Sequence, residues 1–385
     1  MILKTTTGKN LLLGFISLSV SYCLLVMGDW YFNRLIVTET DELMVSNARE
    51  IEALREVSED ESQKKLAIED GFLTIVYPAL FGQVKLEYPL IAGIPDTDTY
   101  DCNEGYGLVR YRSDRFGFRN NDEDWDKPIN SIVIGDSFVH GSCVHADQTL
   151  SKNIERNIGE TVLSLGIGGN SPSEYLAYGE LFIPKVKPSN VILVFGSNDN
   201  NTRATSDLER VYVDEGRKLF SSEKLELFDV TFFKDEGKKA LVTLAGAADR
   251  NNRNYSASLV NYKIKNAFLR HASLPSISEL IASQTHGFSK TEETIRRISK
   301  LCKDYECDLT IAYIPNSNFY RPDLRANQYG DNIADLSSAL GLTFFDGRSA
   351  IDLSEGSEDY APKGPHLSPI GYQKIANLIT SQTGR

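Results

Sequence analysis

The stretch SIVIGDSFVHG at 131–141 decides the fold, because a short apolar run ends in glycine and is followed directly by Asp136 and Ser137. Comparable β-rich apolar runs follow at 161–166, 190–196, 308–315 and 342–346, and helical or mixed sequence separates them. Continuous apolar strands that alternate with helices are typical of a parallel sheet covered on both faces. We therefore predict an α/β fold, with helices at 150–158, 172–186, 290–305, 324–340 and 368–382.

Three further segments flank or interrupt this pattern. Residues 39–68 have the pattern of a polar amphipathic helix, either a stalk or a helix packed on the domain. Residues 71–125, called here the lead-in segment, mix aromatics with glycine and proline and predict an irregular, β-rich structure. Residues 203–260 lie between the third and fourth strands, where a simple crossover needs only about thirty residues. Their short β-like runs RVYVD, LFDVTFF and ALVTLAG predict an inserted lid or substrate-binding segment.

The amino-terminal sequence indicates export. The run LLLGFISLSVSYCLLVM at 11–27 carries no charge, and Lys4 and Lys9 precede it. Its length is at the lower limit for a membrane-spanning helix, and the positive-inside rule places the rest of the chain outside the cytoplasm. We predict a cytoplasmic tip and transmembrane anchor at 1–34, a stalk and lead-in segment at 35–125, and a periplasmic or cell-surface domain at 126–385. The alternative is a signal peptide cleaved near 26–28, which exports the same domain.

Charge and cysteine content narrow the possible partners. The chain has 41 Lys and Arg against 53 Asp and Glu, and this net charge of −12 argues against nucleic acid as a partner. Cys23 lies in the apolar run, and the other cysteines are Cys102, Cys143, Cys302 and Cys307. Of the three possible connectivities, 302–307 with 102–143 is the simplest, and buried free thiols are the alternative. The sequence has no CxxC pair and no zinc-site spacing, so we expect neither a metal nor another cofactor.

Several residues follow the predicted strands where each strand ends, which is where open α/β sheets bind ligands. The N–H of Ser137 lies at a helix start that favours negative charge, and Gly169 lets a backbone N–H approach an oxyanion. Asn198 adds an amide donor after the third strand, and His366 adds an imidazole before the last helix. We expect His140, three residues after Ser137, to have only a shallow packing or solvent-facing role.

Four motifs occur in a fixed order: Gly135-Asp136-Ser137, Gly169, Gly196-Ser197-Asn198-Asp199 and His366-Leu367-Ser368-Pro369-Ile370-Gly371. In this order they resemble the SGNH (GDSL-type) hydrolase family over 130–201 and 290–383. The resemblance implies a three-layer α/β/α, flavodoxin-like sheet with strand order 2-1-3-4-5. It also implies Ser137 as nucleophile, His366 as base, and an oxyanion hole made of the Ser137 N–H, the Gly169 N–H and the Asn198 amide. Residues 113–141 are similar to exported members associated with cell-surface polysaccharide.

The chain departs from the family at one position. The family usually carries an Asp two or three residues before its histidine, and here those positions are Gly364 and Lys363. Three interpretations remain open: a Ser–His dyad oriented by a backbone carbonyl, an Asp359 that folds in from the preceding loop, or impaired catalysis.

The resemblance implies acyl transfer through an acyl-serine intermediate. With water as acceptor the protein is an esterase, and we expect it to act on acyl esters, above all O-acetyl esters, of an extracytoplasmic glycan. With a sugar hydroxyl as acceptor it is an O-acyltransferase. The alternative to an enzyme is a non-catalytic protein that binds acylated glycan. The best indication for it is Lys363, which stands where the family usually carries its Asp. A metal-dependent hydrolase is disfavoured because the sequence has no His/Asp cluster.

Overall fold

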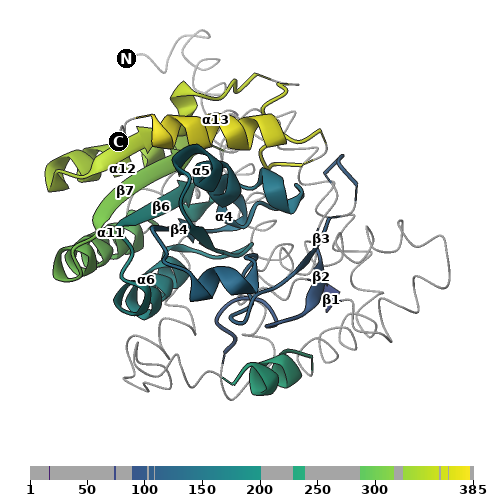
Figure 1. Ribbon diagram of the computed structural model, residues 1–385. Coiled ribbons are helices and arrows are strands. Elements are labelled where there is room, and N and C mark those ends of the chain that lie inside the picture. Colours follow the sequence, from purple (N-terminus) through teal and green to yellow (C-terminus); the bar gives the residue numbers. More distant parts are fainter. Residues whose placement is uncertain are drawn as a thin grey trace, which may run out of the picture. The chain divides into compact units, whose positions relative to one another are not determined.

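The computed structural model describes residues 89–101, 104–107, 109–200, 229–238, 287–315, 324–354, 357–362 and 364–381, together with Ser17 and the strand β1 (Leu73–Thr74) (Figure 1). Apart from Ser17, these residues belong to one compact unit formed by 50–247 and 286–385. The predicted anchor at 11–27 (Ser17 excepted), the predicted helix at 39–68 and most of 203–260 lie outside the described residues. Within the described part of the chain, no helix combines the length and apolar character that a membrane span requires.

A five-stranded parallel sheet forms the centre of this unit. Its strands are β4 (Ser131–Gly135), β5 (Val162–Gly166), β6 (Asn190–Gly196), β7 (Asp308–Ile314) and β8 (Thr343–Asp346). They are arranged in the order β5-β4-β6-β7-β8, and every neighbouring pair is parallel. The prediction of an α/β fold with strand order 2-1-3-4-5 is therefore confirmed.

The strands are apolar throughout because both faces of the sheet are covered. In β4, Ile132 and Ile134 belong to one apolar core, whereas Val133 belongs to the core on the opposite face. This alternation follows from the two-residue period of a strand. The first core includes side chains of α6 (Pro172–Val186), α11 (Gly287–Asp304) and α12 (Leu324–Leu340); the second includes those of α4 (Ser137–His140), α5 (Leu150–Ile158) and α13 (Pro369–Thr380). Figure 1 shows α5 and α13 side by side over one face.

The lead-in segment packs into the first of these cores. Its strands β2 (Asp98–Tyr100) and β3 (Arg110–Arg112) form a separate three-stranded sheet with β1. The Asn120 side chain bonds to the backbone of Ser164 in β5, donating to its oxygen at 2.9 Å and accepting from its nitrogen at 2.8 Å. Leu90 and Ile91 are fully buried beside residues of α6. The lead-in segment is thus part of the structure that supports the main sheet.

One predicted secondary-structure type is wrong. The run LFDVTFF was expected to be β-like, yet residues 230–238 are helical. The Asp229 carboxylate accepts a hydrogen bond from the Phe232 N–H, which caps the helix start, and within the helix Phe233 is buried while Phe232 is exposed. A helix therefore satisfies the first backbone N–H groups while burying one face of the run.

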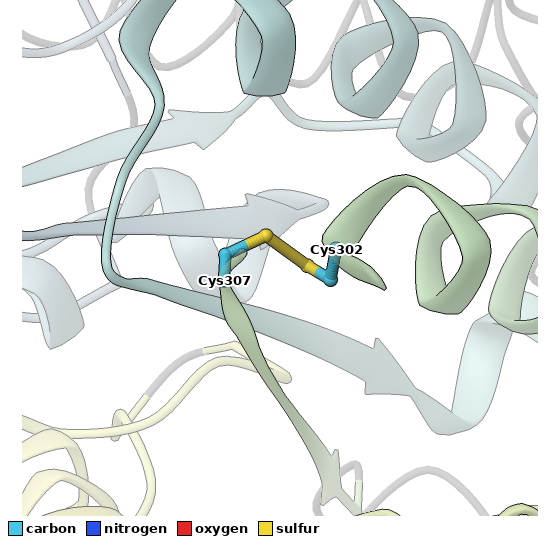
Figure 2. The surroundings of a disulfide bond; sticks show 2 residues. All are labelled: Cys302 and Cys307. Carbon is cyan, nitrogen blue, oxygen red and sulfur yellow. A yellow bond between two sulfur atoms is a disulfide. The ribbon is translucent and has the colours of Figure 1, made fainter. Parts of the chain in front are cut away.

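A disulfide joins Cys302 to Cys307, the pair that the sequence favoured (Figure 2). It connects the last turn of α11 to the residue before β7, with the two Cα atoms 4.6 Å apart. Cys143 is also disulfide-bonded, while its expected partner, Cys102, lies outside the described residues. The second predicted pairing therefore stays a prediction.

Candidate active site

Ser137 is the first residue of α4 and lies two residues after Gly135, the end of β4. Asp136 caps this helix, because its carboxylate accepts a hydrogen bond of 2.9 Å from the Phe138 N–H. The turn is tight at Gly135, where an added Cβ would lie 2.4 Å from Val139 Cγ2 and 3.0 Å from Val194 O. Ser137 is half-buried, and neither its Oγ nor its N–H bonds to any residue within the described part of the chain. No described residue therefore occupies either group.

His366 lies in the loop before α13, and its ring packs edge-on against Phe138 with the centroids 5.5 Å apart. A hydrogen bond of 2.9 Å from Ala361 N to His366 O and a bridge between Tyr360 and Leu367 hold this loop. Since Phe138 follows Ser137 in the chain, the contact places the predicted base beside the turn that carries the predicted nucleophile. Catalytic hydrogen bonds often tighten only when substrate binds.

The other two predicted oxyanion donors lie at neighbouring strand ends. Gly169 is exposed, and its φ of 76° is a left-handed conformation that favours glycine. Asn198 is exposed and donates from Nδ2 to Asp136 Oδ2 at 2.8 Å, which places its amide beside the cap of the Ser137 helix. The pKa of Asp136 is raised because the carboxyl is buried, although the bonds from Asn198 and Phe138 oppose that shift.

Asp199, a buried neighbour of Asn198, stabilises the turn that carries this amide. Its carboxylate accepts hydrogen bonds from Gly196 N at 2.7 Å and from Tyr175 OH at 2.8 Å. Burial, followed by repulsion from Asp136, raises the pKa of Asp199 well above its ordinary value. The family motif Gly-Ser-Asn-Asp therefore presents Asn198 while its last residue faces inward.

Glu104 of the lead-in segment is the acid that contacts His366. Its Oε1 lies 2.8 Å from His366 Nδ1, and its Oε2 accepts from the His366 backbone N–H at 3.3 Å. Only 8% of Glu104 is exposed, so this charge-assisted contact is largely shielded from water. No sequence motif marks Glu104, which lies 262 residues before His366.

Asp359, considered above as an acid that could fold in toward His366, serves a different purpose. Its fully buried carboxylate pairs with Lys374 Nζ of α13 at 2.8 Å and accepts from Asp352 N at 2.8 Å. Its backbone oxygen accepts from Ser368 N, the residue that caps α13. Asp359 therefore does not orient His366; it fixes the start of α13, where Lys374 balances its charge. The acid that contacts the imidazole is Glu104.

The charges around His366 favour its protonated form. Burial lowers the pKa of the imidazole, but attraction to Glu104, its hydrogen bond to Glu104, and attraction to Asp136 and Asp101 together raise that pKa above its ordinary value. An imidazolium that forms when His366 accepts a proton is thus stabilised where it stands.

His140, in contrast, lies deep inside the protein, so the expectation of a shallow role is wrong. Its side chain is fully buried, with Nδ1 3.3 Å from Gly166 O and Nε2 3.7 Å from Asp101 Oδ2. Burial lowers the pKa of His140 to about 4 despite the attraction of Asp101. A neutral, enclosed imidazole in this position packs against the strand end and does not reach substrate.

A buried ion pair connects the lead-in segment to the loop after α4. Arg119 lies 3.5 Å from Asp101, and its guanidinium donates to Gly141 O at 2.7 Å and to Val144 O at 2.6 Å. Asp101 in turn accepts from Cys143 N at 3.0 Å. Arg119 Nε is buried without a hydrogen-bond partner among the described residues, but the other contacts of this pair fix the loop that follows Ser137.

A bound metal is disfavoured by the chemistry of the nearest cluster. Glu104, Cys143 and His366 offer ligand atoms within 4.8 Å of one another. Cys143 is disulfide-bonded, so it has no thiolate to coordinate an ion, and His366 Nδ1 is already engaged by Glu104. The remaining donors are too few for an ordinary zinc site.

Comparison with known proteins supports one family. The family model described as the GDSL-like lipase/acylhydrolase family matches residues 133–374, more than half of the chain. No curated protein is significantly similar to this chain.

Among solved structures, a member of the lipolytic G-D-S-L family from Veillonella parvula matches with 12% identity and a TM-score of 0.38, covering 67% of this chain and 99% of its own. A lipase/acylhydrolase from Enterococcus faecalis matches with 14% identity and a TM-score of 0.35, covering 66% and 94%. A GDSL-like lipase from Bacteroides thetaiotaomicron matches with 11% identity and a TM-score of 0.37, covering 66% and 88%. At these values the family assignment rests on the match over 133–374.

Proposed function

This chain belongs to the GDSL-like lipase/acylhydrolase family, which indicates ester hydrolysis in general, and we propose that it cleaves carboxylic esters through an acyl-serine intermediate on Ser137. The observation that carries the proposal is the Glu104–His366 pair, held at 2.8 Å beside the turn of Ser137. A histidine whose Nδ1 faces a carboxylate keeps Nε2 free to accept a proton.

The proposed reaction has two steps. His366 Nε2 takes the Ser137 Oγ proton while Oγ attacks the ester carbonyl, and the protonated imidazole then gives this proton to the leaving alkoxide. In the second step His366 takes a proton from water, the hydroxide attacks the acyl-serine, and Ser137 regains its proton as the acid leaves. The Ser137 N–H, the Gly169 N–H and the Asn198 amide would stabilise the oxyanion in both steps.

We propose an acylated glycan outside the cytoplasm, with O-acetyl as the acyl group, as the substrate class. The uncharged run at 11–27 with Lys4 and Lys9 before it supports export. The disulfide between Cys302 and Cys307 supports the same compartment, because disulfides persist where conditions are oxidising.

The test is intact-mass analysis of the full chain after treatment with a fluorophosphonate, beside Ser137→Ala and His366→Ala. We expect one adduct on the wild type and none on either variant. The acyl preference follows from rates on p-nitrophenyl acetate, butyrate and octanoate, and from acetate released from an O-acetylated polysaccharide. A folded wild type that neither labels nor hydrolyses these esters would refute the enzyme and favour the binding protein. Transfer to an added sugar in preference to water would identify an O-acyltransferase.

A further inference from the structure

We propose that Glu104 is the positioning residue of His366, and that it occupies the space in which the family carries its Asp. This inference rests on the proposed function, because positioning matters only if His366 acts as the base. Glu104 lies outside the matched residues 133–374, so it reaches the site from a different part of the chain.

Two contacts define how Glu104 holds the histidine. Oε1 meets the ring at Nδ1 at 2.8 Å, and Oε2 accepts the backbone N–H of His366 at 3.3 Å. One carboxylate therefore fixes both the ring and the backbone from which the ring extends. Because an ionised carboxylate only accepts hydrogen bonds, Nδ1 carries the proton and Nε2 is the free nitrogen. This is the tautomer that a general base facing Ser137 requires.

Gly364 shows why the acid cannot also come from the usual position. An added Cβ at Gly364 would lie 1.7 Å from Glu104 Cδ and 1.9 and 2.1 Å from its two carboxylate oxygens. The φ of Gly364 is not in the left-handed region, so its backbone itself would accept a side chain. The carboxylate of Glu104 thus fills the volume into which a side chain at 364, two residues before His366, would have to extend.

Neighbouring contacts hold Glu104 in this place. Gly105 packs against Pro362, with an added Cβ only 3.0 Å from Pro362 Cγ, and Tyr106 packs against the apolar core that includes Leu367. Cys143, a disulfide cysteine, lies within 4.8 Å of the Glu104–His366 pair. Residues on both sides of His366 therefore fix the loop that carries Glu104.

A merely structural role is the competing explanation, in which Glu104 only fastens the lead-in segment to the loop before α13. The two roles differ in what they predict for the charge and for position 364. A structural contact tolerates an isosteric amide, whereas a positioning acid does not, because an amide can hold Nδ1 in the wrong tautomer and removes the charge that stabilises the imidazolium.

The first experiment compares Glu104→Gln with the wild type in the full chain, with Glu160→Gln, an exposed glutamate away from the site, as the matched control. We expect Glu104→Gln to lower kcat on p-nitrophenyl acetate by about 10²- to 10⁴-fold with KM changed little, the upper value being that of a lost triad acid. An NMR titration of the His366 ring, assigned through His366→Gln, should show a lower pKa in Glu104→Gln. Retention of kcat within about twofold, with an unchanged His366 pKa, would overturn the proposal.

The second experiment exchanges the position of the acid. Gly364→Asp alone should lose activity because its side chain collides with Glu104, whereas Glu104→Ala/Gly364→Asp should be at least tenfold more active than Glu104→Ala. Gly364→Asp should thus lower activity when Glu104 is present and raise activity when Glu104 has been replaced by alanine. A double variant that folds but gains nothing over Glu104→Ala would contradict the shared-space argument.

The two proposals fail in different ways. Absence of fluorophosphonate labelling and esterase activity in the wild type would remove the proposed function, while the NMR titration would still decide whether Glu104 controls His366. A wild type that is active and labelled, with Glu104→Gln equally active, would remove only the role of Glu104.

Discussion

Replacing Arg119 with methionine should destabilise the protein strongly, because its buried guanidinium bonds to the loop after Ser137, pairs with Asp101 and lies over the Tyr111 ring. The side chain of Arg119 is 2% exposed and that of Asp101 is 1% exposed. Methionine fills much of the same volume but removes the charged donors to Gly141 O and Val144 O and leaves the Asp101 carboxylate without its cation. Breaking a buried pair in this way costs about 3–5 kcal/mol.

The assay is equilibrium unfolding in guanidinium chloride, with the free energy of unfolding taken from the midpoint and slope. Arg112→Met is the matched control, because Arg112 lies in the same segment and pairs with Asp96 at 2.6 Å but is 58% exposed. We expect this control to lose only about 0–1 kcal/mol. The double variant Asp101→Asn/Arg119→Met should lose less free energy of unfolding than the sum of the two single variants. Each single change leaves one buried charge without its partner, whereas the double change removes both charges. A loss below about 1 kcal/mol for Arg119→Met would refute the reasoning.

Three further predictions concern His366, the disulfide and Gly169. A general base must be neutral and the pKa of His366 is raised, so kcat/KM should climb as pH rises through that pKa, which a pH–rate profile measures. The stability that the Glu104 contact adds should be fully present below the ordinary histidine pKa of about 6.5. It should be lost as pH rises through the raised pKa of the folded protein, which unfolding curves at several pH values measure. Cys302→Ser/Cys307→Ser should reduce the free energy of unfolding by about 2 kcal/mol, since the closed loop is short, while a full rate on p-nitrophenyl acetate after refolding would show that the bond is structural. Gly169→Ala should cost about 1 kcal/mol of stability and lower kcat, because alanine resists φ near 76° and a change in this backbone would move the Gly169 N–H. An unchanged kcat would show that the left-handed backbone of Gly169 does not matter for catalysis.

The sequence predicted the sheet well because its signal is local. The runs that became β4 and β6 are apolar on both faces and end at Gly135 and Gly196, so the pattern alone specified a covered parallel sheet. The place of Ser137 followed in the same way, since Asp136 caps the next helix within two residues.

The acid at His366 could not be predicted locally, because Glu104 and His366 are 262 residues apart. Asp359 lies close to His366 in the sequence and was therefore a reasonable candidate for the acid, yet its carboxylate forms an ion pair with Lys374 on α13. One signal did exist: a disulfide between Cys102 and Cys143 would carry Glu104 close to the loop after Ser137. The helix at 230–238 could not be predicted for a different reason: phenylalanines are typical of a strand, and the hydrogen bond by which Asp229 caps the helix is visible only in the structure.

A cut at 126, the predicted start of the catalytic domain, would remove part of the candidate site. A fragment that begins at 126 would retain Ser137, His366, Asn198 and the complete five-stranded sheet. It would lack Glu104, along with the Asp101–Arg119 pair that braces the loop after the nucleophile. Such a fragment would also lack Phe116 and Phe118, which are buried in the first core. If Glu104 positions His366 as proposed, the residues just before the histidine are a poor guide to catalytic competence in this protein.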